Sequence, residues 1–225
     1  TLRRLKGDVG FRCRYSTNVH ARQTGSMTID RTPLDAFVAD YAAEHHCPTV
    51  AWGVVRDGSL ALAGSVSPGD QHVDEHTVYR IASMTKSFSA AATLLLRDEE
   101  VLRLDDPVSA YDPSLDGLRS PSADAPPIRV RDLLAMTSGL VADDPWADRH
   151  LDLTDEEFDR IVGEGCAFGE PTGLAYEYSN FGFAVLGRVV EWASGMRIQQ
   201  VISERLLAPL GMTSSTWVQP DHDRW

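Results

Sequence analysis

A serine and a lysine three residues apart, Ser83 and Lys86, begin a run of small and apolar residues that extends to Leu96. Residues three apart on an α-helix lie on one face, so the hydroxyl and the amine can come within hydrogen-bonding distance. The N-terminal end of a helix carries a partial positive charge, which stabilises an alkoxide. The spacing therefore indicates a serine nucleophile beside its base. The alternative is a serine N-cap followed by a solvated lysine.

Lysine is rare in this chain. Lys6 and Lys86 are its two lysines, and arginine supplies the other positive side chains. A guanidinium cannot be deprotonated inside a protein, whereas a buried lysine can act as a neutral base. The choice of lysine at position 86 therefore favours a role in proton transfer.

A tyrosine and an asparagine, Tyr178 and Asn180, lie immediately before a second apolar run at 181–193. Side chains two residues apart in an extended segment point to the same side. A phenol near a lysine could pass a proton to and from a nucleophile, and an amide could hold the substrate or the lysine. The alternative is an ordinary core tyrosine followed by Asn180 as the N-cap of a helix.

The composition narrows the classes of partner and cofactor. The formal net charge of −12 argues against nucleic acid and anionic membranes, and no apolar run is long enough to cross a bilayer. Cys13, Cys47 and Cys166 fit no metal-ligand spacing and weakly favour a reducing, cytoplasmic location. His72 and His76 are four residues apart but have no further ligands nearby, so we expect no metal site there.

The first 26 residues differ from the rest, because they contain six basic residues and one acidic residue and show no apolar periodicity. An organellar targeting segment, an expression tag and translated upstream sequence all fit this composition. Residues 1–26 are therefore predicted to be a disordered leader or tag outside the fold.

The remaining sequence predicts a helix and a hairpin followed by helices. Apolar spacing indicates a helix at 33–44 with Thr32 as its N-cap, and Asp57-Gly58 is a typical hairpin turn. The domain from 27 to 225 would divide into the hairpin and nucleophile helix at 27–97 and a mainly helical lobe at 98–225. The predicted elements are strands at 49–56 and 60–65, a surface loop at 114–127, and helices at 83–97, 130–136, 154–162, 181–193 and 198–207.

Five segments together resemble the serine beta-lactamase-like hydrolases, the group of class C beta-lactamases, D-Ala-D-Ala carboxypeptidases and family VIII esterases. The order and spacing of the segments match the family pattern. They are 79–86 (YRIASMTK), 102–108 (LRLDDPV), 133–140 (LLAMTSGL), 178–182 (YSNFG) and 207–212 (LAPLGM). The resemblance implies an α+β fold of the beta-lactamase/transpeptidase type, in which helices flank an antiparallel sheet and an all-helical lobe is inserted.

The same resemblance implies the chemistry. Ser83 would be acylated by an amide, lactam or ester carbonyl of a small molecule or short peptide, while Lys86 and Tyr178 move protons. Asn180 would bind the acyl side of the substrate, and the backbone N–H of Ser83 would be one of two oxyanion donors. Trp146, in a polar loop, would either line the entrance for a hydrophobic group or pin its own loop.

The chain departs from the family pattern in two places. Met136 stands where the family often has histidine, and the family's Lys-Thr-Gly or His-x-Gly triplet is absent from the sequence. We therefore expect the C-terminal strands of the sheet to be missing, in a fragment of a longer hydrolase or in a naturally short relative. An exposed sheet edge would then favour a homo-oligomer.

Two other functions remain open. The chain could be a catalytically incompetent relative that binds peptide or acyl ligands or assembles with partners. It could also be an acidic structural module in which these motifs serve only as helix caps and core residues.

Overall fold

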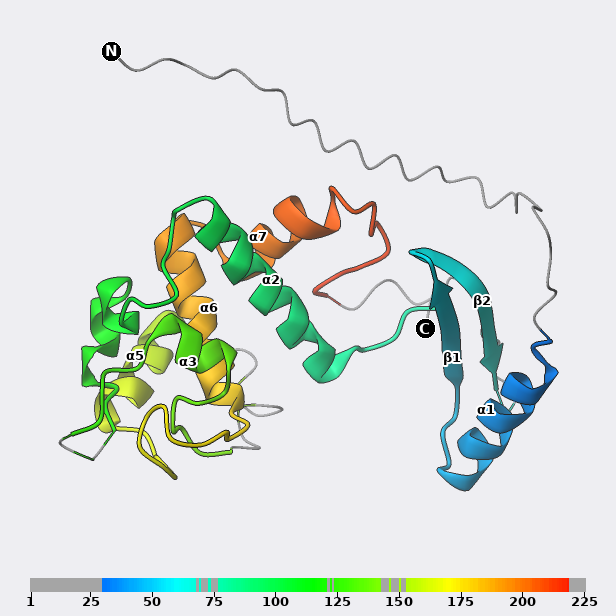
Figure 1. Ribbon diagram of the computed structural model, residues 1–225, viewed down its shortest axis with the longest axis horizontal. Helices are drawn as coiled ribbons and strands as arrows, with labels where there is room; N and C mark the ends of the chain where they lie inside the picture. The colour runs from blue at the N-terminus through cyan, green and yellow to red at the C-terminus, as the bar shows by residue number, and fades with distance from the viewer. Residues whose placement is uncertain are drawn as a thin grey trace, which may run out of the picture. The chain divides into compact units, whose positions relative to one another are not determined.

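The computed structural model describes two compact units, the first up to Tyr79 and the second from Arg80 onward (Figure 1). The described residues are 30–67, 69, 73, 77–120, 122, 124–142, 146, 150 and 153–218. The predicted leader at 1–26 and the pair His72 and His76 lie outside these residues. The division between the units falls inside the range 27–97, for which the sequence predicted the hairpin and the Ser83 helix together.

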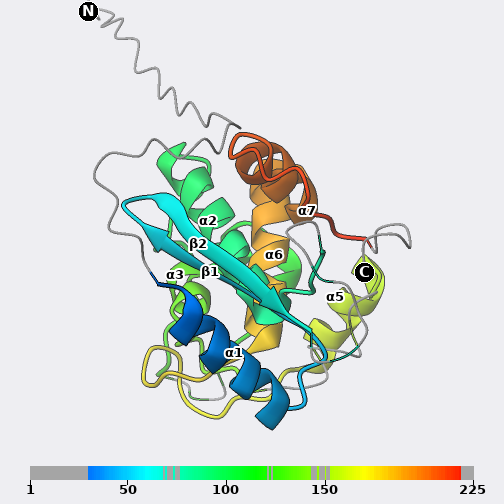
Figure 2. The same ribbon diagram turned by 90° about the vertical axis from the view of Figure 1, so that its right-hand side faces the viewer.

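The first unit consists of a helix and a hairpin. Strands β1 (Val50–Arg56) and β2 (Ser59–Val66) pair antiparallel, with an irregularity in the register after Val54. The two turn residues, Asp57 and Gly58, have φ values of 51° and 73°, as a tight hairpin turn requires. Helix α1 (Thr32–Glu44) lies alongside the hairpin, against β2 (Figure 2). The predicted helix and strands are confirmed to within one residue at each end.

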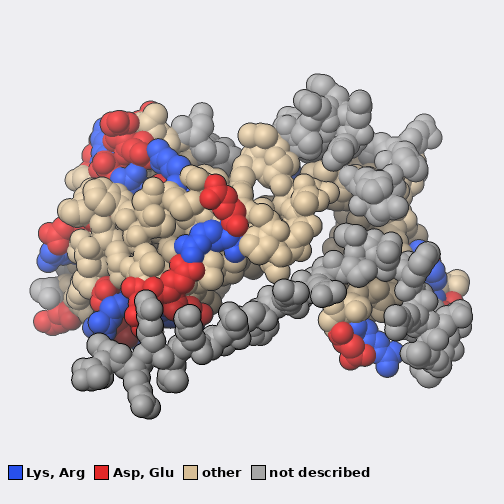
Figure 3. Space-filling model, turned by 90° about the horizontal axis from the view of Figure 1, so that it is seen from above, with Lys and Arg blue, Asp and Glu red and all other residues tan. Residues whose placement is uncertain are grey.

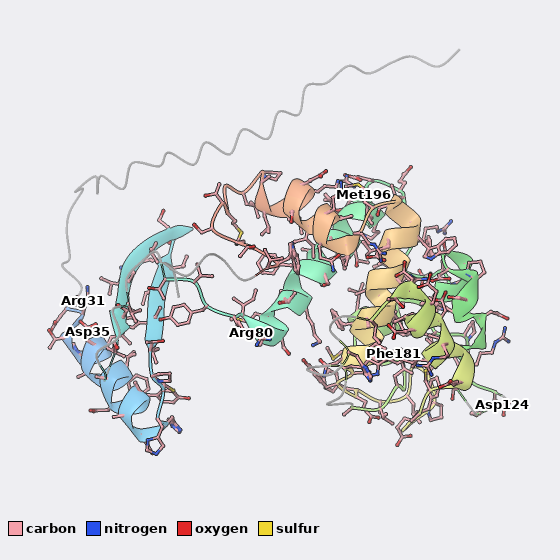
Figure 4. All side chains as sticks on the ribbon, turned by 180° about the vertical axis from the view of Figure 1, so that it is seen from behind. Arg31, Asp35, Arg80, Asp124, Phe181 and Met196 are labelled. Atoms are coloured by element: carbon pink, nitrogen blue, oxygen red, sulfur yellow. The ribbon has the colours of Figure 1, made fainter. Side chains whose placement is uncertain are left out.

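The start of α1 differs from the prediction that Thr32 is its N-cap. Thr32 is already helical, and its backbone N–H donates a hydrogen bond of 3.0 Å to the carboxylate of Asp30. The guanidinium of Arg31 binds Asp35 through two contacts of 2.7 and 3.0 Å (Figure 4). The carboxylate of Asp30 therefore satisfies one of the free backbone N–H groups at the start of α1.

The second unit is helical and is built around α6 (Asn180–Ser194), whose ends lie near Phe181 and Met196 in Figure 4. Apolar side chains of α6 are fully buried against α2, α3 and α7, and Gly195 ends the helix in the left-handed conformation. The combination of helices with an antiparallel hairpin fits the predicted α+β class. The other elements of the unit are α2 (Thr85–Asp98), α3 (Val130–Leu134), α5 (Asp155–Glu164), α7 (Ile198–Ile202) and a π-helical turn at Ser203–Leu207.

The predicted surface loop at 114–127 is wrong in its first part. A 3₁₀ turn at Pro113–Gly117 directs Leu115 into the core, and Leu118 follows it, with exposed fractions of 1% and 3%. Burial of these two leucines therefore determines the structure here, although the surrounding Pro, Asp and Ser residues are typical of a surface loop. The buried side chain of Asp112 caps this turn by accepting the backbone N–H of Ser114 at 2.9 Å.

A charge cluster joins α6 to α5 and to the 3₁₀ turn. The half-buried guanidinium of Arg188 contacts Asp112 at 3.2 Å, Asp155 at 2.9 Å and Asp159 at 3.2 Å. Arg197 binds the two oxygens of Asp155 at 2.9 Å each, and this hydrogen bonding lowers the pKa of the Asp155 carboxyl. Figure 3 shows acidic and basic side chains next to one another on the surface of this unit. The cluster therefore fixes three segments that carry the core of the unit.

Candidate active site

Ser83 lies in a 3₁₀ turn, Ala82–Met84, that leads directly into α2. The sequence predicted Ser83 within the first turn of the α-helix, whereas α2 begins at Thr85. The backbone N–H of Met84 closes the turn on the carbonyl of Ile81 at 3.0 Å. Lys86 falls on the first turn of α2, so the two residues still face the same side.

The residue before Ser83 has a strained backbone. Ala82 has a φ of 44°, in the left-handed region that residues other than glycine seldom adopt. Such a conformation costs on the order of 1–2 kcal/mol in an L-residue and persists when the surrounding structure imposes it. The left-handed conformation of Ala82 therefore changes the direction of the main chain immediately before Ser83.

The four residues that the sequence singled out from the two motifs meet in the structure. Tyr178 donates its hydroxyl proton to Ser83 Oγ at 2.7 Å. Lys86 Nζ donates to Ser83 Oγ at 3.4 Å and to Asn180 Oδ1 at 2.6 Å. The Ser83 hydroxyl therefore has a phenol and an amine within hydrogen-bonding distance, and either group can exchange a proton with it.

Two aromatic rings also face Lys86. Its Nζ lies 4.7 Å from the ring centre of Tyr178 and 5.7 Å from that of Phe183. The two rings therefore border the Lys86 amino group and restrict where its side chain can lie. The sequence analysis missed Phe183, although its spacing of three from Asn180 on a helix was a signal that could have identified it.

Ser179, not Asn180, caps α6. Ser179 Oγ accepts the backbone N–H of Gly182 at 3.1 Å, and the residue is 2% exposed. Asn180 is the first helical residue, and its side-chain oxygen accepts from Lys86 instead. The interpretation of Asn180 as an N-cap is therefore wrong, because the neighbouring serine already performs that function.

The segment 136–142 supports the loop that carries Tyr178. Gly139 has a φ of 83°, and a Cβ at this position would collide with the backbone carbonyl of Glu170. Only glycine allows this approach of two backbones. The hydrogen bonds that join the segments include Glu177 N to Met136 O at 2.8 Å, Gly173 N to Thr137 O at 2.7 Å, Gly169 N to Gly139 O at 2.9 Å and Thr172 Oγ1 to Ser138 O at 3.0 Å.

Trp146 contacts core side chains. Its ring centre lies 4.6 Å from that of Phe181, 5.9 Å from that of Phe158 and 4.9 Å from that of His150. Phe158 and Phe181 belong to the buried core of α5 and α6. Trp146 thus joins its segment to the core through its ring contacts with Phe158 and Phe181.

The described ranges contain no group of three or more His, Cys, Asp or Glu side chains that could hold a metal ion. Cys47 and Cys166 are thiols. Within the same part of the chain, no helix is both long enough and apolar enough to span a bilayer.

Comparison with known proteins gives one family and several relatives. The family described as Beta-lactamase matches residues 34–224. The D-alanyl-D-alanine-carboxypeptidase/endopeptidase AmpH of Escherichia coli K12 is 30% identical over 221 residues, which cover 92% of this chain and 56% of AmpH. The chain therefore spans about half the length of the curated relatives it matches.

Two solved structures extend the comparison. The octameric penicillin-binding protein homologue from Pyrococcus abyssi is 26% identical with a TM-score of 0.64, over 82% of this chain and 44% of that one. A class C beta-lactamase is 22% identical with a TM-score of 0.72, over 87% of this chain and 54% of that one. The second likeness concerns the fold alone, and it confirms the predicted beta-lactamase/transpeptidase-like architecture.

Proposed function

Because this chain belongs to the beta-lactamase family, a family with hydrolases among its members, we propose that it acts as a serine hydrolase with Ser83 as nucleophile. One observation carries the proposal: Ser83 Oγ lies 2.7 Å from the Tyr178 hydroxyl and 3.4 Å from Lys86 Nζ. Tyr178 and Lys86 are therefore both within reach of the proton that Ser83 must lose when it attacks a carbonyl carbon.

The reaction proceeds in two steps. In the first, Ser83 Oγ bonds to the carbonyl carbon of an amide, lactam or ester, and its proton passes to the Tyr178–Lys86 pair. The bond from that carbon to the leaving nitrogen or oxygen then breaks, and the leaving group takes the proton. In the second step water attacks the acyl-enzyme, its proton returns through the same pair, and the acid and free Ser83 are released.

The other site residues have supporting roles in this proposal. Asn180 holds Lys86 by its side-chain oxygen and, as the family resemblance implies, borders the acyl side of the substrate. The backbone N–H of Ser83 serves as one oxyanion donor. The contacts of Trp146 with Phe158 and Phe181 favour the interpretation in which it pins its own segment.

The substrate class that we propose is a small molecule or short peptide with a reactive carbonyl. The relative AmpH is a D-alanyl-D-alanine carboxypeptidase/endopeptidase, which favours a peptide amide, while lactams and short esters fit the same chemistry. No cofactor enters this mechanism.

We further propose a homo-oligomer and a cytoplasmic location. The described sheet is a two-stranded hairpin, whose outer edges can pair with a second copy, and the relative from Pyrococcus abyssi is octameric. The location rests on the cysteine pattern, which includes no disulfide between Cys47 and Cys166.

Intact-mass measurement tests the hydrolase. The protein is incubated with a p-nitrophenyl ester or a penicillin and quenched with acid, and the expected result is a covalent adduct that Ser83→Ala abolishes. A folded protein that never acquires an adduct would favour the alternative, a relative that binds peptide or acyl ligands without turnover. Circular dichroism of both proteins supplies the check on folding.

A further inference from the structure

Glu177 precedes Tyr178, and it is bound to the segment 136–142 through both its side chain and its main chain. Its Oε1 accepts the backbone N–H of Ala142 at 3.1 Å, and its backbone N–H donates to the carbonyl of Met136 at 2.8 Å. Its carboxylate also covers Gly169, where a Cβ would collide with Oε2. The side chain and the main chain of Glu177 are therefore both fixed to the support of the Tyr178 loop.

Glu177 and Tyr178 act on opposite sides of the same short segment. The carboxylate of Glu177 reaches Ala142 and Gly169, while the hydroxyl of Tyr178 reaches Ser83. One peptide unit connects the two Cα atoms and it is planar, so a rotation at residue 177 is passed directly to residue 178. A displacement of the main chain at Glu177 would therefore also move the Cα of Tyr178.

We propose that Glu177 is a positioning residue for Tyr178. Its hydrogen bond to Ala142 and its fit over Gly169 fix the main chain so that the phenol oxygen lies 2.7 Å from Ser83 Oγ. The proposal deepens the serine hydrolase function and rests on it for the catalytic consequence. The geometric part, in which Glu177 fixes the Tyr178 ring, stands without it.

Two substitutions disturb the contact between Glu177 and Gly169, one at each residue. Glu177→Ala removes the acceptor, and Gly169→Ala places a methyl group where Glu177 Oε2 now lies. Glu177→Gln retains an oxygen that can accept from Ala142, so it separates the hydrogen bond from the charge. Gly163→Ala is the matched glycine control, because a Cβ there meets no atom within 4 Å.

The first readout is the steady-state hydrolysis of a p-nitrophenyl ester, from which kcat and KM are obtained. Glu177→Ala and Gly169→Ala should lower kcat about 10- to 100-fold with little change in KM, because a displacement of about 1 Å in a reacting group costs up to about 100-fold. Glu177→Gln should stay within about threefold of the parent protein. Gly163→Ala should match the parent.

The second readout is independent of activity. The protein is labelled with ¹³C at the tyrosine Cζ atoms, and the Tyr178 signal is identified by its loss in Tyr178→Phe. This signal should shift or split in Glu177→Ala and Gly169→Ala and stay in place in Glu177→Gln and Gly163→Ala. If Glu177→Ala does not fold, Gly169→Ala decides the question.

Two results would overturn the proposal: an unchanged Tyr178 signal in Glu177→Ala or Gly169→Ala, or equal losses of kcat in Glu177→Gln and Glu177→Ala. A parent protein that is never acylated, but whose Tyr178 signal responds to Glu177→Ala, would contradict the hydrolase function and support the positioning role.

Discussion

Lys86 Nζ and Asn180 Oδ1 lie 2.6 Å apart, although 94 residues separate them in the chain. The contact joins the first turn of α2 to the first turn of α6, the two helices that begin directly after Ser83 and Tyr178. It is possible because Ser179 caps α6 and leaves the Asn180 side-chain oxygen to the lysine. The position of the amine is therefore set by a helix start more than ninety residues away.

The first prediction concerns the chemistry of Lys86. Lys86→Arg keeps the positive charge but cannot act as a base, so it should lower the acylation rate about 10²- to 10⁴-fold, nearly as much as Lys86→Ala. The measurement is the steady-state hydrolysis of a p-nitrophenyl ester by each variant. Turnover in Lys86→Arg close to that of the parent would refute the role of the amine in proton transfer.

The second prediction concerns the strained residue Ala82. Ala82→Gly should change the free energy of unfolding by less than about 1 kcal/mol, because relief of the left-handed strain offsets the greater freedom of glycine in the unfolded chain. Ala82→Val should destabilise the protein by more than about 1 kcal/mol, since a β-branched side chain tolerates φ of 44° poorly. Urea denaturation measures both, and equal stability of the valine variant and the parent would contradict the prediction.

The third prediction concerns pH. Hydrogen bonding to Arg197 lowers the pKa of the Asp155 carboxyl in the folded state below its ordinary value of 3.8. A lowered carboxyl pKa adds stability that is fully present above pH 3.8 and is lost as the pH falls through the folded-state value. Arg197→Met should therefore reduce the urea midpoint at pH 7, and the difference from the parent should shrink toward pH 3.

The opposite pH trend, a difference that grows as the pH falls, would contradict this assignment. Arg119→Met is a suitable control, because Arg119 forms an exposed pair with Asp116 that is not part of the α5–α6 cluster. Exposed pairs contribute little, so this variant should be nearly as stable as the parent at both pH values.

Much of the architecture could be predicted from the sequence, because the local signals are strong. The period of the apolar residues gave α1, and Asp57-Gly58 specified the hairpin turn. The two motifs also identified the four residues that meet at Ser83. In each case the information lies within a few neighbouring residues.

The features that the sequence did not predict depend on distant contacts. Leu115 is buried because the helical core has room for it, although its neighbours are typical of a surface loop. Ala82 adopts a positive φ because of what surrounds it, and alanine itself gives no signal of this. The role of Glu177 depends on Ala142, 35 residues away. No local pattern contains such relationships.

The central claim is that Ser83 itself becomes acylated, and peptide mapping tests it most directly. Trypsin cleaves after Arg80, Lys86 and Arg97, so Ser83 lies in the peptide 81–86 while Ser87 and Ser89 lie in 87–97. The protein is acylated with a p-nitrophenyl ester, quenched in acid, digested and fragmented by tandem mass spectrometry. We predict the acyl group on Ser83 within 81–86, in the parent and in Ser87→Ala alike. An acyl group on peptide 87–97 or on Thr85 would contradict the account. So would the absence of any acylated peptide 81–86 from a sample that is hydrolysing the ester when it is quenched.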